Sequence, residues 1–240
     1  MSGERHIRAE RIGSGRIVLL DLWRGLALLL MIGHHICYDL ALFGYRDYAF
    51  LQTVPVKMLH WFSAYPFIFL AGTSSRFSRS NLQRGLKVFA CALVVSLVTE
   101  MIGNPIRFGI LHFLGVSMIL YDLCGQWLQK IPDALAPLLW LGLFVVTKVW
   151  TNGALVESRW LWVFGFPYAG FYSSDYFPML PWVFLFLLGS WFGGVLQAHR
   201  EHPLLQLSCP QWLLWPGQHT LVIYLVHQPL LYGIFWFISR

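Results

Sequence analysis

The chain has 240 residues, of which 57% are hydrophobic and 12% are charged. A typical soluble domain carries about twice that share of charged residues, and the mean hydropathy here is +0.59. These values exclude a soluble globular enzyme, a disordered tail and a nucleic-acid-binding module. The 12 Trp, 10 Tyr and 19 Phe fit a membrane protein, because aromatic rings gather at the membrane–water interface.

Apolar runs recur along the whole chain and predict an all-α membrane protein. A membrane-spanning helix needs roughly 20 apolar residues, so we expect a bundle of about seven transmembrane helices in a single domain over 16–240, preceded by a basic cytoplasmic tail at 1–15. The first run is too long for a signal-peptide core and is read as the first span. The runs are 17–38, 55–72, 85–102, 107–124, 135–150, 180–197 and 219–238.

The segment between the fifth and sixth predicted helices, residues 151–180, is long, aromatic and rich in Gly and Pro. A plain solvated loop would be more polar. We therefore expect an extracytoplasmic loop that re-enters or follows the membrane surface and covers a cavity.

Lys and Arg residues set the expected orientation. With the N-terminus inside, ten of them lie on the cytoplasmic side, six lie outside, and Arg24 lies within the first span. The positive-inside rule then predicts a cytoplasmic N-terminus and an external C-terminus. The cytoplasmic group is Arg5, Arg8, Arg11, Arg16, Arg76, Arg79, Arg84, Lys87, Lys130 and Arg200; the external group is Arg46, Lys57, Arg107, Lys148, Arg159 and Arg240.

Ionisable residues inside spans are costly and are candidates for function. On the first helix, Asp21, Arg24, His35 and Asp39 belong to one stripe with spacings of three and four. His35 and Asp39 are one turn apart, so the carboxylate is expected to orient the imidazole of a general base. At about 1.5 Å per residue, one outer layer collects His34, His35, Asp39, His60, Glu100, Arg107, His112 and Asp175. His227 falls near the middle of the bilayer.

Each of these features also has a simpler interpretation. An intramembrane His often serves only to bind a neighbouring helix, and Asp21 with Arg24 is better explained as a structural ion pair. The basic cluster from Arg76 to Lys87 is either an orientation signal or a phosphate clamp. The GxxxG motif at 189–193 is weak support for a homodimer. No metal is expected, because the histidines lack HxxxH spacing and a clear set of carboxylates.

Several motifs resemble the catalytic domain of the heparan-alpha-glucosaminide N-acetyltransferase family. They are residues 16–35 (RIVLLDLWRGLALLLMIGHH), 67–75 (FIFLAGTSS), 107–117 (RFGILHFLGVS), 175–182 (DYFPMLPW) and 223–229 (IYLVHQP). The resemblance implies a multi-pass protein of the bacterial cytoplasmic membrane, in contact with lipid. It would move an acetyl group from cytoplasmic acetyl-CoA to an amino sugar or glycan on the far side.

The resemblance and the residue pattern together suggest roles for particular side chains. His112 and Asp175 fall in family motifs, and Arg24, Arg76, Arg79 and Arg84 would hold the donor's phosphates. His35 oriented by Asp39, or alternatively His112, would deprotonate the acceptor, although an acetyl-histidine intermediate is equally open. Arg107 would stabilise an oxyanion or bind an anionic sugar.

Two other functions use the same residues. A proton-coupled transporter would use the outer layer as a relay, and a non-catalytic membrane subunit would use its polar groups only to pack helices. The clustering of the ionisable residues on one side and the absence of paired sequence halves argue against the transporter.

Overall fold

The structure, a computed structural model, describes residues 17–128 and 130–240. The predicted basic tail at 1–15, with its arginines and the neighbouring Arg16, lies outside these residues. Across the described ranges the secondary structure is helical, with no β-strand. The helices are α2 (Val18–Leu42), α3 (Val54–Arg76), α4 (Asn81–Met101), α5 (Ile110–Leu128), α6 (Ala136–Thr151), α7 (Met179–Ala198), α8 (Gln211–Gln218) and α9 (Thr220–Ile238), with short 3-10 helices at Tyr48–Gln52, Leu161–Phe164 and Pro203–Leu205.

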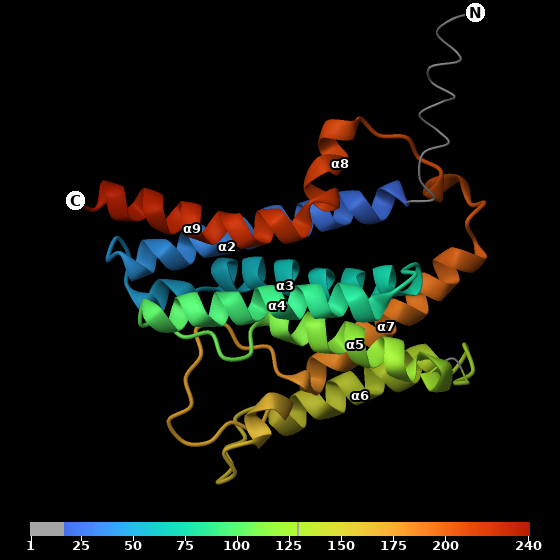
Figure 1. The fold of residues 1–240 in the computed structure, drawn as a ribbon, viewed down its shortest axis with the longest axis horizontal. Coiled ribbons are helices and arrows are strands. Elements are labelled where there is room, and N and C mark those ends of the chain that lie inside the picture. Colours follow the sequence, from blue (N-terminus) through green and yellow to red (C-terminus); the bar gives the residue numbers. More distant parts are fainter. Residues whose placement is uncertain (1–16, 129) are drawn as a thin grey trace, which may run out of the picture.

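The long helices run back and forth along one axis, so the bundle has two ends (Figure 1). The Val18 end holds the start of α2 and the α3–α4, α5–α6 and α7–α8 connections. The Leu42 end holds the α2–α3, α4–α5 and α6–α7 connections and the C-terminus. Residues at the outer ends of different predicted spans therefore meet at one end of the molecule, the Leu42 end.

Each of the seven apolar runs corresponds to a helix, and α8 is an addition that the sequence did not predict. Within the described residues, five helices are long and apolar enough to cross a membrane: α2, α4, α5, α7 and α9. α6 has only 16 residues, and α3 carries Pro66 and several polar residues. These helices are consistent with a multi-pass membrane protein, and a total of about seven membrane crossings stays a prediction.

Glycines bring α3 and α7 into close backbone contact. A Cβ on Gly72 would lie 1.9 Å from the carbonyl oxygen of Phe186, and one on Gly189 would lie 2.0 Å from that of Phe69. Gly193 approaches Thr73 in the same way, at 2.6 Å. The GxxxG motif at 189–193 therefore packs inside the chain, as small residues do in membrane helix pairs, and it gives no support to a homodimer.

The helices α4 and α5 form a helical hairpin, and a hydrogen bond also links them at the end opposite their connection. A Cβ on Gly85 would lie 2.8 Å from the Gly115 carbonyl oxygen, so these helices also cross at glycines. At the Val18 end, the Asp122 carboxylate of α5 accepts a hydrogen bond from the backbone N–H of Asn81 at 2.9 Å. This bond satisfies one of the unpaired N–H groups at the start of α4.

The aromatic segment between α6 and α7 packs on the bundle. Its backbone bonds the α4–α5 connection, through Ser174 N to Pro105 O at 3.0 Å and Phe177 N to Phe108 O at 2.8 Å. Trp162 and Tyr176 lie against the core that includes the fully buried Phe113 and Phe186. The segment thus covers the start of α5, whereas its position outside the cytoplasm stays a prediction.

The short helix α8 fixes the position of α9 along α2. A Cβ on Gly217 would lie 1.8 Å from the Asp21 carbonyl oxygen, so α8 sits directly on the first turns of α2. The next helix, α9, then begins well along α2 and continues beside it to the Leu42 end (Figure 1). There Phe43, just after α2, stacks on Phe235 of α9 with ring centroids 5.9 Å apart.

Candidate active site

Four imidazole rings form a continuous series at the Leu42 end, here called the histidine array: His60, His34, His35 and His227. The ring centroids of His60 and His34 are 4.8 Å apart, those of His34 and His35 are 5.7 Å apart, and those of His35 and His227 are 4.8 Å apart. The rings come from α3, α2 and α9. Among the described residues, no group of His, Cys, Asp or Glu is arranged to hold a metal ion.

Hydrogen bonds assign the tautomers of the two rings at the α2–α9 contact. His227 Nδ1 lies 2.6 Å from the Tyr224 carbonyl oxygen, so this nitrogen carries the proton and Nε2 is an acceptor. His227 Nε2 lies 3.2 Å from His35 Nδ1, which also lies 3.0 Å from the Met31 carbonyl oxygen. His35 Nδ1 is therefore the donor, and its Nε2 keeps a lone pair that can accept a proton.

The predicted pairing of His35 with Asp39 is wrong. Asp39 is fully buried at 0% exposure, and its Oδ1 accepts a hydrogen bond from Gln228 Nε2 at 3.0 Å. No hydrogen bond joins His35 to Asp39 in the described part of the chain. Helical side chains lean toward the N-terminus, so His35 turns back to Met31, while Asp39 binds α9. The ring that orients His35 is that of His227, whereas Asp39 joins α2 to α9 through its hydrogen bond with Gln228.

His112 lies at the start of α5 in a separate environment. It is buried, with its ring between those of Phe89 and Phe108, and its Nε2 lies 3.2 Å from Ser96 Oγ. Ser96 donates its own proton to the Ile106 carbonyl oxygen, so it accepts from His112 Nε2–H. His112 Nδ1 is buried and has no hydrogen-bond partner among the described residues. That His112 and His35 line one cavity stays a prediction.

Asp175 binds the first residue of α5. Its Oδ2 accepts a hydrogen bond from Ile110 N at 2.9 Å, and a Cβ on Gly109 would lie 2.3 Å from that oxygen. The carboxylate thus satisfies an unpaired N–H at a helix N-terminus, where negative charge is favoured. Burial nevertheless raises the pKa of Asp175 to about 6, and the Ile110 hydrogen bond opposes that rise.

Asp175 and Arg107 differ in their relation to the histidine array. Asp175 is close enough to Tyr224 of α9 for their charges to interact, and the Tyr224 ring lies 5.5 Å from that of His227. Arg107 is exposed and contacts the aromatic segment, through its Nη1 to Tyr168 OH at 3.3 Å. Asp175 therefore lies nearer to the array than its sequence position indicates, and Arg107 binds the loop.

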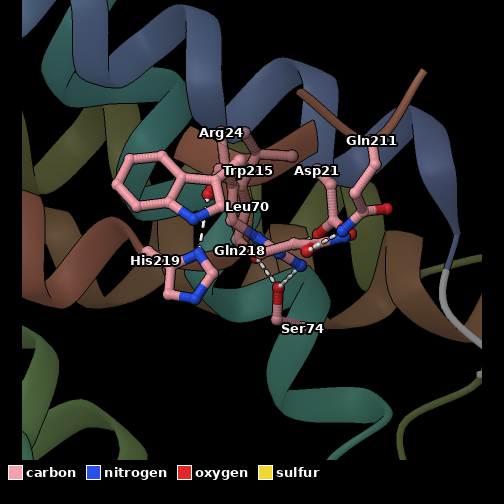
Figure 2. A network of polar contacts seen from close by, with 8 residues as sticks. All are labelled: Asp21, Arg24, Leu70, Ser74, Gln211, Trp215, Gln218 and His219. Atoms are coloured by element: carbon pink, nitrogen blue, oxygen red, sulfur yellow. Dashed lines mark hydrogen bonds and ion pairs between the residues drawn. The ribbon is translucent and has the colours of Figure 1, made fainter. Parts of the chain in front are cut away.

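A polar network lies at the opposite, Val18 end (Figure 2). Arg24 forms an ion pair with Asp21, as the sequence indicated, and donates to Ser74 Oγ at 2.9 Å. The Ser74 hydroxyl in turn donates to the Leu70 carbonyl oxygen at 2.5 Å. Figure 2 places these groups beside the side chains of Gln211 and Gln218, which bond each other at 2.9 Å.

The four arginines proposed to hold phosphates all lie toward the Val18 end, but they do not form one cluster. Arg24 of α2 and Arg84 of α4 are close enough for their charges to repel each other. Arg76 lies along α7, since a Cβ on Gly194 would be 3.5 Å from its Nε, and Arg79 is exposed between α3 and α4. Like charges that repel each other in this way are stabilised by an anionic ligand, which guanidinium groups bind well.

Residues 16–229 match the family described as heparan-alpha-glucosaminide N-acetyltransferase, catalytic. The chain belongs to this family. The match covers most of this heparan-alpha-glucosaminide N-acetyltransferase-like chain, ends at Pro229 in α9, and includes the whole histidine array. No curated protein and no solved structure matches the chain. The family name describes a transferase of acetyl groups, and the long apolar helices fit a membrane enzyme of that kind.

Sequence reasoning missed His227 as the partner of His35 and Gln228 as the partner of Asp39. Counting residues from 219 places His227 near the middle of the bilayer, because α9 is then assumed to begin at the membrane surface. The apolar residues around Trp212 and Trp215, followed by Pro216 and Gly217, were the available signal for a short helix before α9.

Proposed function

We propose that the chain is an integral-membrane acetyltransferase. It moves the acetyl group of cytoplasmic acetyl-CoA to the amino group of an amino sugar or glycan on the extracytoplasmic side of the bacterial inner membrane, with its N-terminus in the cytoplasm. The family match over residues 16–229 carries this proposal. The separation of arginines at the Val18 end from histidines at the Leu42 end supports it, because donor phosphates and an acceptor amine need these different groups.

His35 is the proposed general base. Its Nε2 takes a proton from the acceptor amine while the amine nitrogen bonds to the acetyl carbon and the carbon–sulfur bond of the thioester breaks. The imidazolium then returns that proton to the departing thiolate, so His35 ends the cycle neutral. His227 holds the Nδ1–H tautomer throughout, and His112 is the alternative base.

Acetyl-CoA supplies the activated acetyl group. Arg24 and Arg84 are the proposed phosphate ligands, because guanidinium forks match phosphate oxygens, and Arg76 and Arg79 would add positive charge nearby. Ser74 and Asp21 hold the Arg24 side chain in place. The phosphates of acetyl-CoA would thus be bound at the Val18 end of the bundle.

Transfer of radiolabelled acetyl groups to glucosamine by the purified protein tests the proposal. We expect His35→Ala to lower turnover by about 100-fold or more, since general base catalysis contributes that much, with little change in acetyl-CoA affinity. His199→Ala is the matched control, because that ring is exposed at the end of α7 and bonds Val195 O, one turn back.

Near-normal turnover in folded His35→Ala would contradict the assignment of the base. His112→Ala, measured in parallel, then tests the alternative. A folded wild-type protein that binds neither acetyl-CoA nor amino sugars, or that transports an amino sugar without acetylating it, would overturn the proposed function itself.

A further inference from the structure

An open apolar groove of about 900 Å³ follows α3 between α2 and α7. Its wall includes Ile17 and Leu20 of α2, Phe62 and Phe69 of α3, and Phe192 of α7. Along α3 the lining extends from Met58 to Leu70, a length of about 18 Å at 1.5 Å per residue. That length is close to one leaflet of the hydrocarbon core, which is about 15 Å, so the groove suits a single lipid tail.

One charge is held in this groove. Among the described residues that line it, Lys148 alone is charged. Its ammonium donates to the Tyr65 hydroxyl and lies over the rings of Tyr65, Trp182 and Phe144 at 4.9, 5.2 and 5.7 Å from their centroids. Aromatic faces attract such a cation.

The position of the Lys148 ammonium is fixed by the surrounding aromatic rings. Lys148 is an exposed residue in the last turn of α6. Its side chain leans back toward the N-terminus of α6, as helical side chains do, so that the ammonium lies over Phe144, one turn earlier. The charge therefore lies at the wall of the groove, where it can meet an anionic group attached to a lipid.

The groove is connected to the histidine array through His60. The Trp182 ring beneath the Lys148 ammonium lies 5.1 Å from the ring of Phe177, which lies 6.0 Å from that of His60. The His60 ring contacts that of His34, which contacts that of His35. An anion bound at Lys148 would thus place the next group of the same molecule at the array.

We infer that the groove binds the tail of a lipid-linked sugar phosphate, with its phosphate on Lys148 and its amino sugar at His35. The acceptor is then an amphiphile that reaches the site from within the membrane. This inference rests on the proposed function, and it adds the chemical class of the acceptor to it.

Binding is tested without catalysis by photolabelling with benzophenone-tagged farnesyl phosphate in detergent. We expect Lys148→Ala to lower labelling about tenfold, the loss of one charged hydrogen bond, and Lys148→Arg to restore it. Lys57→Ala is the control, because Lys57 lies at the same end of the bundle and outside the groove lining. Unlabelled farnesyl phosphate should compete, and farnesol or inorganic phosphate alone should compete weakly. Equal labelling of Lys148→Ala, or equal competition by farnesol, would show an ordinary lipid contact and overturn the inference.

Turnover then tests the acceptor class. Farnesyl phosphate-linked glucosamine should have a kcat/KM about 100-fold above that of glucosamine 1-phosphate, since only the first acceptor can bury an apolar tail in the groove. Lys148→Ala should reduce this preference, and Lys57→Ala should leave it unchanged. Equal kcat/KM values for the two acceptors would overturn the lipid inference and leave the acetyltransferase intact. Labelling that depends on Lys148, without acetylation of either acceptor, would overturn the proposed function and leave the lipid site.

Discussion

At the scale of single residues, the base candidate is oriented by a second imidazole where the sequence suggested a carboxylate. A carboxylate would stabilise a charged imidazolium, whereas the neutral His227 accepts one hydrogen bond and fixes the tautomer of His35. His227 is itself fixed, because its Nδ1 is bound to the Tyr224 carbonyl oxygen. His227 is therefore a positioning residue for His35.

Substitutions at His227 test this role. His227→Ala removes the acceptor, so His35 can adopt the other tautomer, and we expect kcat to fall about 10-fold to 100-fold. His227→Gln offers a carbonyl oxygen in place of Nε2 and should recover most of kcat. The measurement is kcat and its pH profile for both variants, with acetyl-CoA affinity as the control for folding. Equal losses of kcat in both variants would mean that His227 only packs α9 against α2.

The half-buried carboxyl of Asp175 gives a pH dependence of stability. Burial raises its pKa from 3.8 to about 6, so between these values the folded protein binds more protons than the unfolded chain. The free energy of unfolding therefore falls as the pH rises from about 4 to about 6. Asp175→Asn cannot titrate, and its side-chain oxygen can still accept from Ile110 N. In thermal melts from pH 4 to pH 7, the Tm of the wild type should fall relative to that of the variant. A Tm difference that is constant with pH would contradict this account.

At the scale of helices, the bundle depends on backbone contacts at glycine. Gly189→Ala would place a methyl group 2.0 Å from the Phe69 carbonyl oxygen, so α3 and α7 must separate. We expect a loss of about 1–3 kcal/mol in stability, typical of overpacking. Gly142→Ala in α6 is the matched control, because nothing lies within 4 Å of its added methyl group. The Tm values of both variants are the measurement, and an unchanged Tm for Gly189→Ala would contradict the close packing of α3 on α7.

The helices could largely be predicted from the sequence, because the length of each apolar run nearly determines its helix. Their relative positions along the bundle axis could not, because these depend on contacts such as that of Gly217 with the Asp21 backbone. That contact places His227 beside His35, although counting residues from the start of α9 leaves it near the middle of the bilayer. The direction of each helix was enough to predict that His34, His35 and His60 lie at the same end of the bundle. The hydrogen-bond partners of Asp39 and His112 could not be predicted, because they depend on side-chain conformations that sequence spacing does not reveal.

At the scale of the whole molecule, the two ends of the bundle differ in chemistry. Arg24 and Arg84 lie toward the Val18 end, and the histidine array lies toward the Leu42 end. The proposed orientation puts the first in the cytoplasm and the second outside. The thioester end of acetyl-CoA would then have to reach along the bundle to the histidine array, so donor and acceptor meet from opposite sides of the membrane.

Vectorial acetyl transfer in oriented proteoliposomes tests this central claim most directly. Radiolabelled acetyl-CoA is supplied on the side of the Val18 end, and the amino-sugar acceptor is supplied only on the side of the Leu42 end. We expect acetylated sugar to accumulate with the acceptor, and we expect His35→Ala vesicles to form about 100-fold less. Acetylation only when donor and acceptor are on the same side, or equal product from His35→Ala vesicles, would contradict a transmembrane transfer at the histidine array.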